Sequence, residues 1–402
     1  MTEAAQTDLR QLSLAELEVF FRELGQPAYR AQQVFRWLHQ RGARRFEEMT
    51  DLSKDLRETL QAHATCAPME IAKVERATDG TRKYALRTAH GDVCEAVFIP
   101  DASAEGRNTL CISSQVGCAI DCKFCLTASL GLLRNLGAGE IVEQITRVKE
   151  DLILHPHRSV RPPVPDFADE ADDDPDPQAP PDPAPHTERA AKVRAPMAPQ
   201  LIGNVVMMGM GEPLQNYNAV ITALQTMGSP LSHHISPRRI TVSTAGLAPR
   251  IPRLGQDVPV NLAVSLNATT DEVRDRIMPI NKKWNIKALL AACQEFPLAQ
   301  RRRITFEYVL LADTNDSDED ARRLVRLLRP FRCKVNLIPF NEHPYSPFKR
   351  PSRERVARFQ SIVGAAGMTV LVRTARGDEI SAACGQLGAE VDAPRRMLTV
   401  LP

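Results

Sequence analysis

The sequence predicts an α/β protein: a partial barrel of six β/α units, preceded by a small helical accessory domain and a β-hairpin extension. Apolar runs of strand length recur between residues 108 and 340. Amphipathic stretches of helix length separate them, and this alternation is typical of a parallel sheet covered by helices. In residues 1–65 the apolar positions instead recur at helical spacing. These observations together indicate a mixed fold with its largest unit in the second part of the chain.

Residues 1–65 are expected to form the helical accessory domain. Ser13 and Glu16 have the spacing of a capping box ahead of LAELEVFFRELG, and a second helix is expected over YRAQQVFRWLHQRG. The arginines around this second helix fit an ordinary solvated surface and an RNA-contacting surface equally well. Residues 66–107 are expected to form the β extension, with a hairpin over 82–100 that turns at HGD.

The partial barrel is expected over residues 108–387, followed by a C-terminal tail over 388–402. A late run, MTVLVRT at 368–374, predicts an additional edge strand. The six predicted barrel strands are TLCIS (109–113), NVVMMG (204–209), RITVST (239–244), VNLAVSL (260–266), ITFEYVLL (304–311) and KVNLIPF (334–340).

Residues 156–199 interrupt this pattern. They contain twelve of the thirty prolines and the acidic run DEADDD, and no apolar periodicity survives in them. We interpret them as a disordered insertion after the first barrel helix. Residues 155–199 carry five Lys or Arg and nine Asp or Glu. The rest of the chain therefore has 46 Lys or Arg and 40 Asp or Glu. That mildly basic remainder permits a nucleic-acid partner without demonstrating one.

Composition excludes several classes of protein. No apolar run approaches the roughly 20 residues of a membrane helix. The start, MTEAAQTDLR, lacks the charged beginning and apolar stretch of a signal peptide. We therefore expect a cytoplasmic protein without membrane association, and nothing in the sequence demands more than a monomer. Nine cysteines are too sparse for a disulfide scaffold, and clustered thiols in a reducing cytosol usually bind metal or take part in catalysis.

Three cysteines form a C-x3-C-x2-C motif directly after the first predicted barrel strand: Cys118, Cys122 and Cys125. Three thiolates at this spacing can bind three irons of a [4Fe–4S] cluster and leave the fourth iron open to chelate a ligand's amine and carboxylate. A structural zinc site is the alternative. Zinc normally needs four protein ligands, and no fourth Cys or His follows at finger-like spacing. The motif therefore favours the cluster.

Polar residues also follow the predicted strands. Gly211 and Glu212 end the NVVMMG run; a glycine lets the backbone approach a ligand, and a carboxylate accepts hydrogen bonds from an ammonium group. Taken singly, such residues are usually turn residues or helix caps. Because β/α barrels build their sites at the carboxyl ends of the strands, several of them at one edge favour a cofactor site. The other members of this set are Ser243, Ser265, Leu266, Asn267 and Asn341.

The other six cysteines are isolated in sequence, and isolated cysteines are usually small buried hydrophobes. We interpret four of them in this way: Cys66, Cys94, Cys293 and Cys333. Spacing alone gives the same interpretation for Cys111 and Cys384.

A family resemblance changes the interpretation of these last two. The cysteine motif after the first strand resembles the radical S-adenosylmethionine superfamily. CISSQVGCAIDCKFC, VVMMGMGEPL, PINKKWN and RGDEISAACGQL together resemble the dual-specificity adenine-C2 methyltransferases of 23S rRNA and tRNA. The likeness runs from about residue 12 to the C-terminus, outside the insertion. Relatives that methylate adenine C8 share the cysteines, whereas Pro213, Lys282-Lys283 and Arg376-Gly377-Asp378 favour the C2 enzymes.

The resemblance implies a barrel of radical S-adenosylmethionine type, a [4Fe–4S] cluster, and S-adenosylmethionine as methyl donor and radical source. It implies methylation of the peptidyl-transferase-centre adenine 2503 of 23S rRNA and of adenine 37 of tRNA. Adenine C2 has no lone pair with which to displace a methyl group, whereas a cysteine thiolate is a good nucleophile.

Three catalytic residues are carried over from the family. Cys384 accepts a methyl group from one S-adenosylmethionine. A radical made from a second S-adenosylmethionine then removes a hydrogen atom from this methyl group, and the resulting methylene radical adds to C2. Protein and RNA are then covalently joined. Glu95 accepts the C2 proton, and Cys111 attacks the Cys384 sulfur, so that the RNA leaves as a transient disulfide forms.

The implied partners are structured RNA, whose base edge must leave the stack, and an electron donor such as flavodoxin or ferredoxin. Asn267 departs from the family, which often has His there, but it still offers a donor and an acceptor. The rival hypotheses are a C8-specific or other radical enzyme, and a non-catalytic iron–sulfur carrier or RNA-binding regulator, which would have no use for Cys384. The candidate phosphate contacts are Arg238, Arg239, Lys282, Lys283, Arg373 and Arg376.

Overall fold

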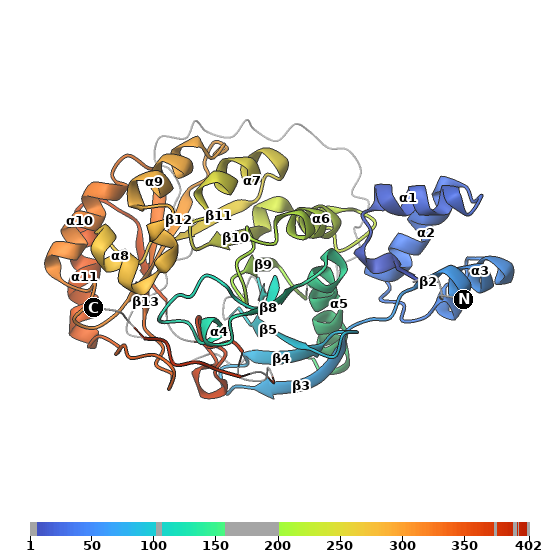
Figure 1. Cartoon of the computed structure of the whole chain (residues 1–402), viewed down its shortest axis with the longest axis horizontal. Coiled ribbons are helices and arrows are strands. Elements are labelled where there is room, and N and C mark those ends of the chain that lie inside the picture. Colours follow the sequence, from blue (N-terminus) through green and yellow to red (C-terminus); the bar gives the residue numbers. More distant parts are fainter. Residues whose placement is uncertain are drawn as a thin grey trace, which may run out of the picture.

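The computed structural model describes residues 6–101, 107–156, 201–373, 376–388, 392 and 394–399. Apart from Pro156, the predicted insertion over 156–199 lies outside these residues. Figure 1 shows a large α/β body with a small group of helices at one end. No helix among the described residues is long and apolar enough to span a membrane.

A ten-stranded sheet runs through the body in the order β14-β13-β12-β11-β10-β9-β6-β5-β4-β3. Its centre consists of six parallel strands in chain order, as predicted, and β14 (Val370–Val372) adds the predicted edge strand, also parallel. Within the described residues the sheet stays open between β14 and β3, so the predicted partial barrel is confirmed. The six central strands are β6 (Thr109–Cys111), β9 (Asn204–Met207), β10 (Ile240–Thr244), β11 (Asn261–Ser265), β12 (Ile304–Leu310) and β13 (Cys333–Pro339).

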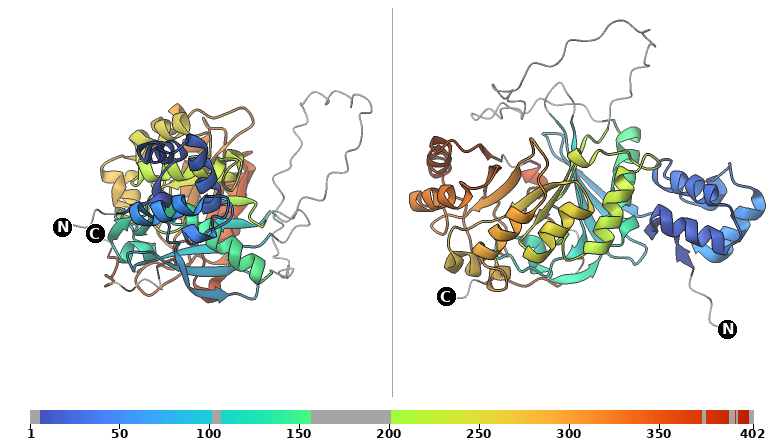
Figure 2. Two further views of the ribbon diagram at one scale, coloured as in Figure 1. Left: turned by 90° about the vertical axis from the view of Figure 1, so that its right-hand side faces the viewer. Right: turned by 90° about the horizontal axis from the view of Figure 1, so that it is seen from above.

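Helices cover one face of the parallel strands (Figures 1 and 2). Their apolar stripes enter the core; in α10, for example, Leu324 and Leu328 are fully buried, and Ser317 and Asp320 form a capping box at its start. These helices are α5 (Ala138–Leu154), α6 (Tyr217–Gly228), α7 (Ile251–Asp257), α8 (Asp271–Ile277), α9 (Ile286–Glu295), α10 (Asp318–Leu328) and α11 (Arg353–Ala365).

Three antiparallel strands extend the sheet beyond β6: β5 (Val93–Ile99), β4 (Arg82–Arg87) and β3 (Glu70–Arg76). The predicted hairpin is formed by β4 and β5, and Gly91 takes the positive φ of 88° that its turn requires. The edge strand β3 was not predicted from the sequence. It is an edge strand with no buried residue, so it lacks the apolar alternation that marks a strand in sequence.

The N-terminal helices have an apolar core of their own. They are α1 (Leu14–Glu23), α2 (Ala28–His39) and α3 (Lys54–His63). The short strand β1 (Thr7–Asp8) before them pairs in parallel with β2 (Ala64–Thr65) after them. The predicted capping box is present: the Glu16 carboxylate accepts from the Ser13 backbone N–H at 2.8 Å, and the Ser13 hydroxyl accepts from the Glu16 N–H at 3.3 Å. Arg10 connects these helices to the body through a buried ion pair with Glu143 of α5, at 2.5 Å. The domain boundaries themselves stay predictions.

Candidate active site

The three-cysteine motif lies on a loop between β7 (Gln115–Gly117) and α4 (Leu126–Ser129). Gly117 has φ 75°, and a Cβ there would collide with the Gly131 carbonyl, so only glycine fits this entry to the loop. The backbone fixes the loop at two points. The Cys118 N–H donates to Gly131 O at 2.8 Å, within the β7–β8 (Leu132–Asn135) hairpin, and the Lys123 N–H donates to Ile277 O at 2.9 Å, at the end of α8.

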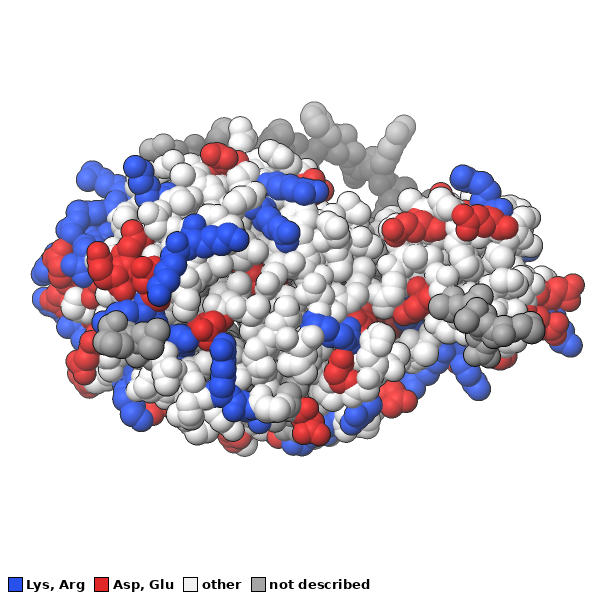
Figure 3. All heavy atoms as spheres, in the orientation of Figure 1, with Lys and Arg blue, Asp and Glu red and all other residues white. Residues whose placement is uncertain are grey.

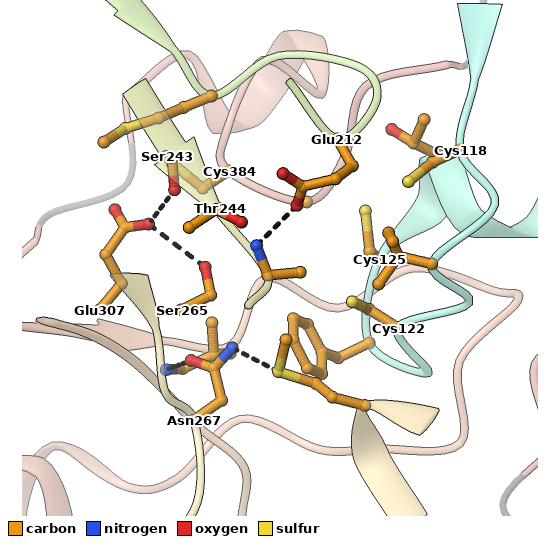
Figure 4. A pocket seen from close by; sticks show the side chains of 18 of the residues that line it. Cys118, Cys122, Cys125, Glu212, Ser243, Thr244, Ser265, Asn267, Glu307 and Cys384 are labelled. Carbon is orange, nitrogen blue, oxygen red and sulfur yellow. Dashed lines mark hydrogen bonds between the residues drawn. The ribbon is translucent and has the colours of Figure 1, made fainter. Parts of the chain in front are cut away.

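All three thiols line one cavity, which measures about 930 Å³ including its open mouth (Figure 4). No three His, Cys, Asp or Glu side chains in the described part of the chain are close enough to hold a single metal ion. In a cubane cluster each thiolate binds a different iron, which needs a wider spread than a mononuclear site. Three thiols on one loop that face one cavity fit a [4Fe–4S] cluster, since three protein ligands leave one iron open.

The cavity lies at the carboxyl ends of the parallel strands, where the sequence places it. Here a set of side chains that we call the strand-end ring faces the cysteine loop (Figure 4). This is the side of a β/α barrel on which ligand sites form. The strand-end ring consists of Glu212, Ser243, Ser265, Asn267 and Glu307.

Glu212 is the most constrained member of the ring. It is 2% exposed, and its carboxylate accepts from the N–H groups of Leu214 at 3.0 Å and Ala245 at 2.6 Å. Burial raises its pKa to about 7, against these two hydrogen bonds. Gly211 just before it has φ 97°, which brings the chain close to Gln115. A carboxylate held in this way, at a cavity wall, can bind an ammonium group.

Glu307 of β12 was missed by the sequence analysis. Its carboxylate accepts from the hydroxyls of Ser243 at 2.9 Å and Ser265 at 3.4 Å, and so joins three neighbouring strands (Figure 4). Burial raises its pKa above the usual range. The available signal was a charged residue inside the otherwise apolar run ITFEYVLL, since a central parallel strand rarely carries a carboxylate without a use for it.

Two of the residues predicted to bind the cofactor have amide side chains, Asn267 and Asn341, and both line the cavity. The Asn267 amide accepts from the Val309 N–H at 2.8 Å and donates toward the Met278 sulfur at 3.2 Å, in a backbone with φ 57°. Asn341 donates to Cys384 O at 3.1 Å, while its buried Oδ1 has no hydrogen-bond partner among the described residues. Leu266 does not line the cavity; its backbone carbonyl accepts from the Arg274 guanidinium at 2.9 Å.

Residues 376–388, which we call the Cys384 segment, bring the distant cysteine to this cavity. Gly385 O accepts from the Leu126 N–H at 2.7 Å, and Leu387 O accepts from the Thr127 hydroxyl at 2.7 Å, so the segment lies against α4 beside the cysteine loop. Cys384 is exposed and lines the cavity. Loss of hydration to the surrounding protein raises the pKa of its thiol to about 11, and the negative charge of Glu307 adds to this increase.

Cys111 and Glu95 do not line the cavity, but each lies near the Cys384 segment. Cys111 ends β6 and is buried; burial raises the pKa of its thiol, and the nearby Cys384 thiol adds to the increase. Glu95 on β5 is fully buried, and its carboxylate accepts from the Gly388 N–H at 2.8 Å, within the Cys384 segment. The structure thus brings both residues to the segment that carries Cys384.

The six basic candidates fall into three groups. Arg373 follows β14 at the cavity edge, close enough for its charge to lower the pKa of Cys384. Arg238 and Arg239 directly precede β10, at the opposite edge of the sheet from the cavity, so the structure does not bring them to the site. On the face in Figure 3 basic side chains are mixed with acidic ones rather than gathered around one opening. Lys282, Lys283 and Arg376 stay predicted contacts.

Comparison with known proteins gives a consistent result. The family model for the ribosomal RNA large subunit methyltransferase N-terminal domain matches residues 7–66. The dual-specificity RNA methyltransferase RlmN of Pelobacter propionicus is 47% identical over 397 residues, covering 98% of this chain and 99% of that protein. The protein of the same name from Geobacter sulfurreducens is 47% identical over 386 residues, covering 96% and 93%. A crystal structure of a radical SAM methyltransferase from Sphaerobacter thermophilus matches 96% of this chain and 100% of its own, with a TM-score of 0.77 and 39% identity.

Proposed function

The chain belongs to the RlmN family of dual-specificity RNA methyltransferases and is a radical S-adenosylmethionine enzyme; from this premise we propose that it methylates adenine C2 through a methylated Cys384. The specific nucleotides that we propose as its targets are adenine 2503 of 23S rRNA and adenine 37 of tRNA. The observation that supports this most is that Cys384 lines the same cavity as Cys118, Cys122 and Cys125, from a segment far away in sequence.

The family implies an iron–sulfur cluster and S-adenosylmethionine, and the residues present fit both. Cys118, Cys122 and Cys125 would hold the cluster, and Glu212 would accept from the methionine ammonium. Asn341, with its buried unpartnered oxygen, and the Ser243–Glu307–Ser265 group would bind other polar parts of the ligand. When bound, the cluster supplies the electron that cleaves S-adenosylmethionine to a carbon radical.

We assign the remaining catalytic steps to three side chains of this protein. The Cys384 thiolate displaces the methyl group from S-adenosylmethionine, forming a C–S bond as S-adenosylhomocysteine leaves. After a hydrogen atom is removed from that methyl group, the methylene radical bonds to adenine C2, and the adduct gives one electron back to the electron-transfer system that supplied it. Glu95 takes the C2 proton, and the Cys111 thiolate attacks the Cys384 sulfur, which breaks its bond to the carbon. That carbon keeps the electron pair of the broken bond and takes up a proton, which completes the new methyl group on C2. The resulting disulfide needs two electrons from an external reductant before the next turnover.

We also propose a monomeric enzyme served by a small electron-transfer protein such as flavodoxin or ferredoxin. The function is tested by mass spectrometry of nuclease-digested rRNA and tRNA from a deletion strain, with and without the restored gene. Loss of 2-methyladenosine in both RNAs, and its return with the gene, is the expected result. Retained 2-methyladenosine in a strain without a paralogue would contradict the proposal, and loss of 8-methyladenosine instead would favour the C8 alternative.

A further inference from the structure

A second cavity lies directly behind the Cys384 segment. Cys384 and Gly385 line the first cavity, whereas Ser381 and Gln386 line the second. Its other walls include Leu126 of α4, His343 and Tyr345 from the loop after β13, and Arg395. The backbone of the Cys384 segment is therefore the partition between the two cavities, and nothing in the proposed chemistry uses the second one.

Two of the residues that line this second cavity, Gln386 and His343, each carry a buried hydrogen-bond acceptor. Gln386 is 7% exposed; its side-chain N–H donates to Glu342 O at 3.3 Å, and its Oε1 has no partner in the described part of the chain. The Nε2 of His343 lies 3.2 Å from Phe124 O. A carbonyl can only accept, so Nε2 carries the ring hydrogen and Nδ1 is left as an acceptor.

That His343 Nδ1 is also buried without a partner among the described residues. Leaving a buried acceptor unsatisfied costs on the order of 1–3 kcal/mol. Two such atoms on residues that line one cavity favour a ligand that brings at least two N–H donors, toward which the two side chains can turn.

The remaining walls include an aromatic ring and a guanidinium, which suit a flat ligand, and Glu342, whose carboxylate pairs with Lys349 at 3.1 Å. Tyr345 is half-buried, and the Arg395 guanidinium lies 5.8 Å from the centre of its ring. Arg395 also donates to Gly388 O, which ties it to the Cys384 segment. An aromatic ring stacks on a base, and a guanidinium contacts phosphate or stacks in turn.

We propose that the second cavity binds the base of a nucleotide that neighbours the target adenine, through an exocyclic amino group. This inference rests on the proposed function, because it presumes that RNA enters beside Cys384. An amino group of adenine, cytosine or guanine offers two hydrogens to Gln386 and His343. Uracil presents carbonyl oxygens on either side of a single N–H, so it would place acceptor against acceptor.

The test uses the cluster-loaded full chain and short stem-loop RNAs that contain the target adenine. Each neighbouring nucleotide is replaced in turn by uridine or by an abasic residue, and kcat/KM for methylation is measured. At one neighbouring position both replacements should lower kcat/KM by about 10-fold to 100-fold. Gln386→Met keeps the volume and removes the acceptor, so the penalty at that position should shrink to a few-fold. Gln225→Met makes the same change on an exposed position of α6 and should behave like the unaltered enzyme.

Equal kcat/KM for every neighbouring base in the unaltered enzyme would overturn this inference while leaving the proposed function standing. A failure to methylate even the unmodified RNA, under conditions where Cys384 itself becomes methylated, would overturn the proposed function and the inference with it. Intact-protein mass spectrometry of Cys384 methylation, without RNA, shows that Gln386→Met is folded. If Gln386→Met is not folded, the inference is decided by the kcat/KM values of the unaltered enzyme for the RNAs with replaced neighbouring nucleotides.

Discussion

The strand-end ring and the Cys384 segment meet at one cavity but are held there in different ways. The members of the ring lie on adjacent strands of one sheet or just after them. They bond to neighbouring parts of that sheet: Ser243 to Glu307, and Glu212 to the backbone just after β10. The segment has almost no regular structure. Four of its residues have positive φ: Gly377, Ser381, Gly385 and Gly388.

The contacts of the segment come from parts of the chain that are far apart. Its N–H groups donate to Asp79 and Glu95, and its carbonyls accept from Leu126, Thr127 and Asn341. Sites on strands keep fixed geometry, whereas loops can move at low cost. The difference suits the two tasks: the ring holds a ligand in one place, while Cys384 must meet a methyl donor, an adenine and Cys111 in turn.

The largest effect is expected from Cys384→Ser. The hydroxyl cannot replace the thiolate as methyl carrier, so RNA methylation should fall below detection while the iron and sulfide content stays normal. Cys122→Ser, on the cysteine loop, is the matched control and should lose both RNA methylation and the bound iron and sulfide. Measurable RNA methylation by Cys384→Ser would show that the segment is not the methyl carrier.

Glu95→Gln separates the catalytic role of Glu95 from its structural one. Glutamine can still accept from the Gly388 N–H but cannot take a proton, so kcat should fall by about 10²-fold to 10⁴-fold with KM little changed. Covalent protein–RNA product should accumulate. If Glu95→Gln works normally and only Glu95→Ala fails, Glu95 merely holds the segment.

Within the ring, the Glu212 carboxylate should make ligand binding depend on pH. Its pKa of about 7 means that it is ionised above this pH and protonated below it. Only the ionised form can pair with an ammonium group, so affinity for S-adenosylmethionine should weaken as the pH falls through about 7, measured by calorimetry on the cluster-loaded enzyme. In Glu212→Gln the affinity should be about 10-fold to 100-fold weaker and nearly independent of pH. A flat profile in the unaltered enzyme would rule Glu212 out as the ammonium partner.

The smallest effect is expected where α4 holds the Cys384 segment. Thr127→Val removes the hydrogen bond to Leu387 O, worth about 1 kcal/mol, so amide exchange across residues 376–388 should speed up by about fivefold. Ser129→Ala is the control, since its hydroxyl donates to Leu126 O within α4 itself. Equal exchange in both variants would mean that other contacts fix the segment.

Much of the ring could be predicted from the sequence, and the reason is geometric. Parallel strands end at one edge of a sheet, so Ser243, Ser265 and Asn267 could be grouped from strand order alone. Glu307 was not identified because its side chain lies within a strand rather than after one. The strand ends were predicted up to two residues too late in β6, β9 and β11, since apolar residues such as Leu266 continue past the last ladder pairing.

The position of Cys384 could not be predicted from periodicity. A segment without regular structure is placed by long-range contacts, such as the one between Gly388 and Glu95, 293 residues apart. Only the family resemblance connected Cys384 to the cysteine motif. The second cavity had no signal at all, because His343 and Gln386 belong to two loops whose meeting depends on the finished fold.

The central claim is that Cys384 is joined covalently to RNA and that Cys111 releases it. The most direct measurement is a denaturing gel and mass spectrum of Cys111→Ala after reaction with S-adenosylmethionine, a reductant and substrate RNA. The account predicts a stable adduct that links adenine C2 to the Cys384 sulfur through one methylene carbon, in a variant with a full cluster. Methylated RNA released at the normal rate, with no adduct, would contradict it.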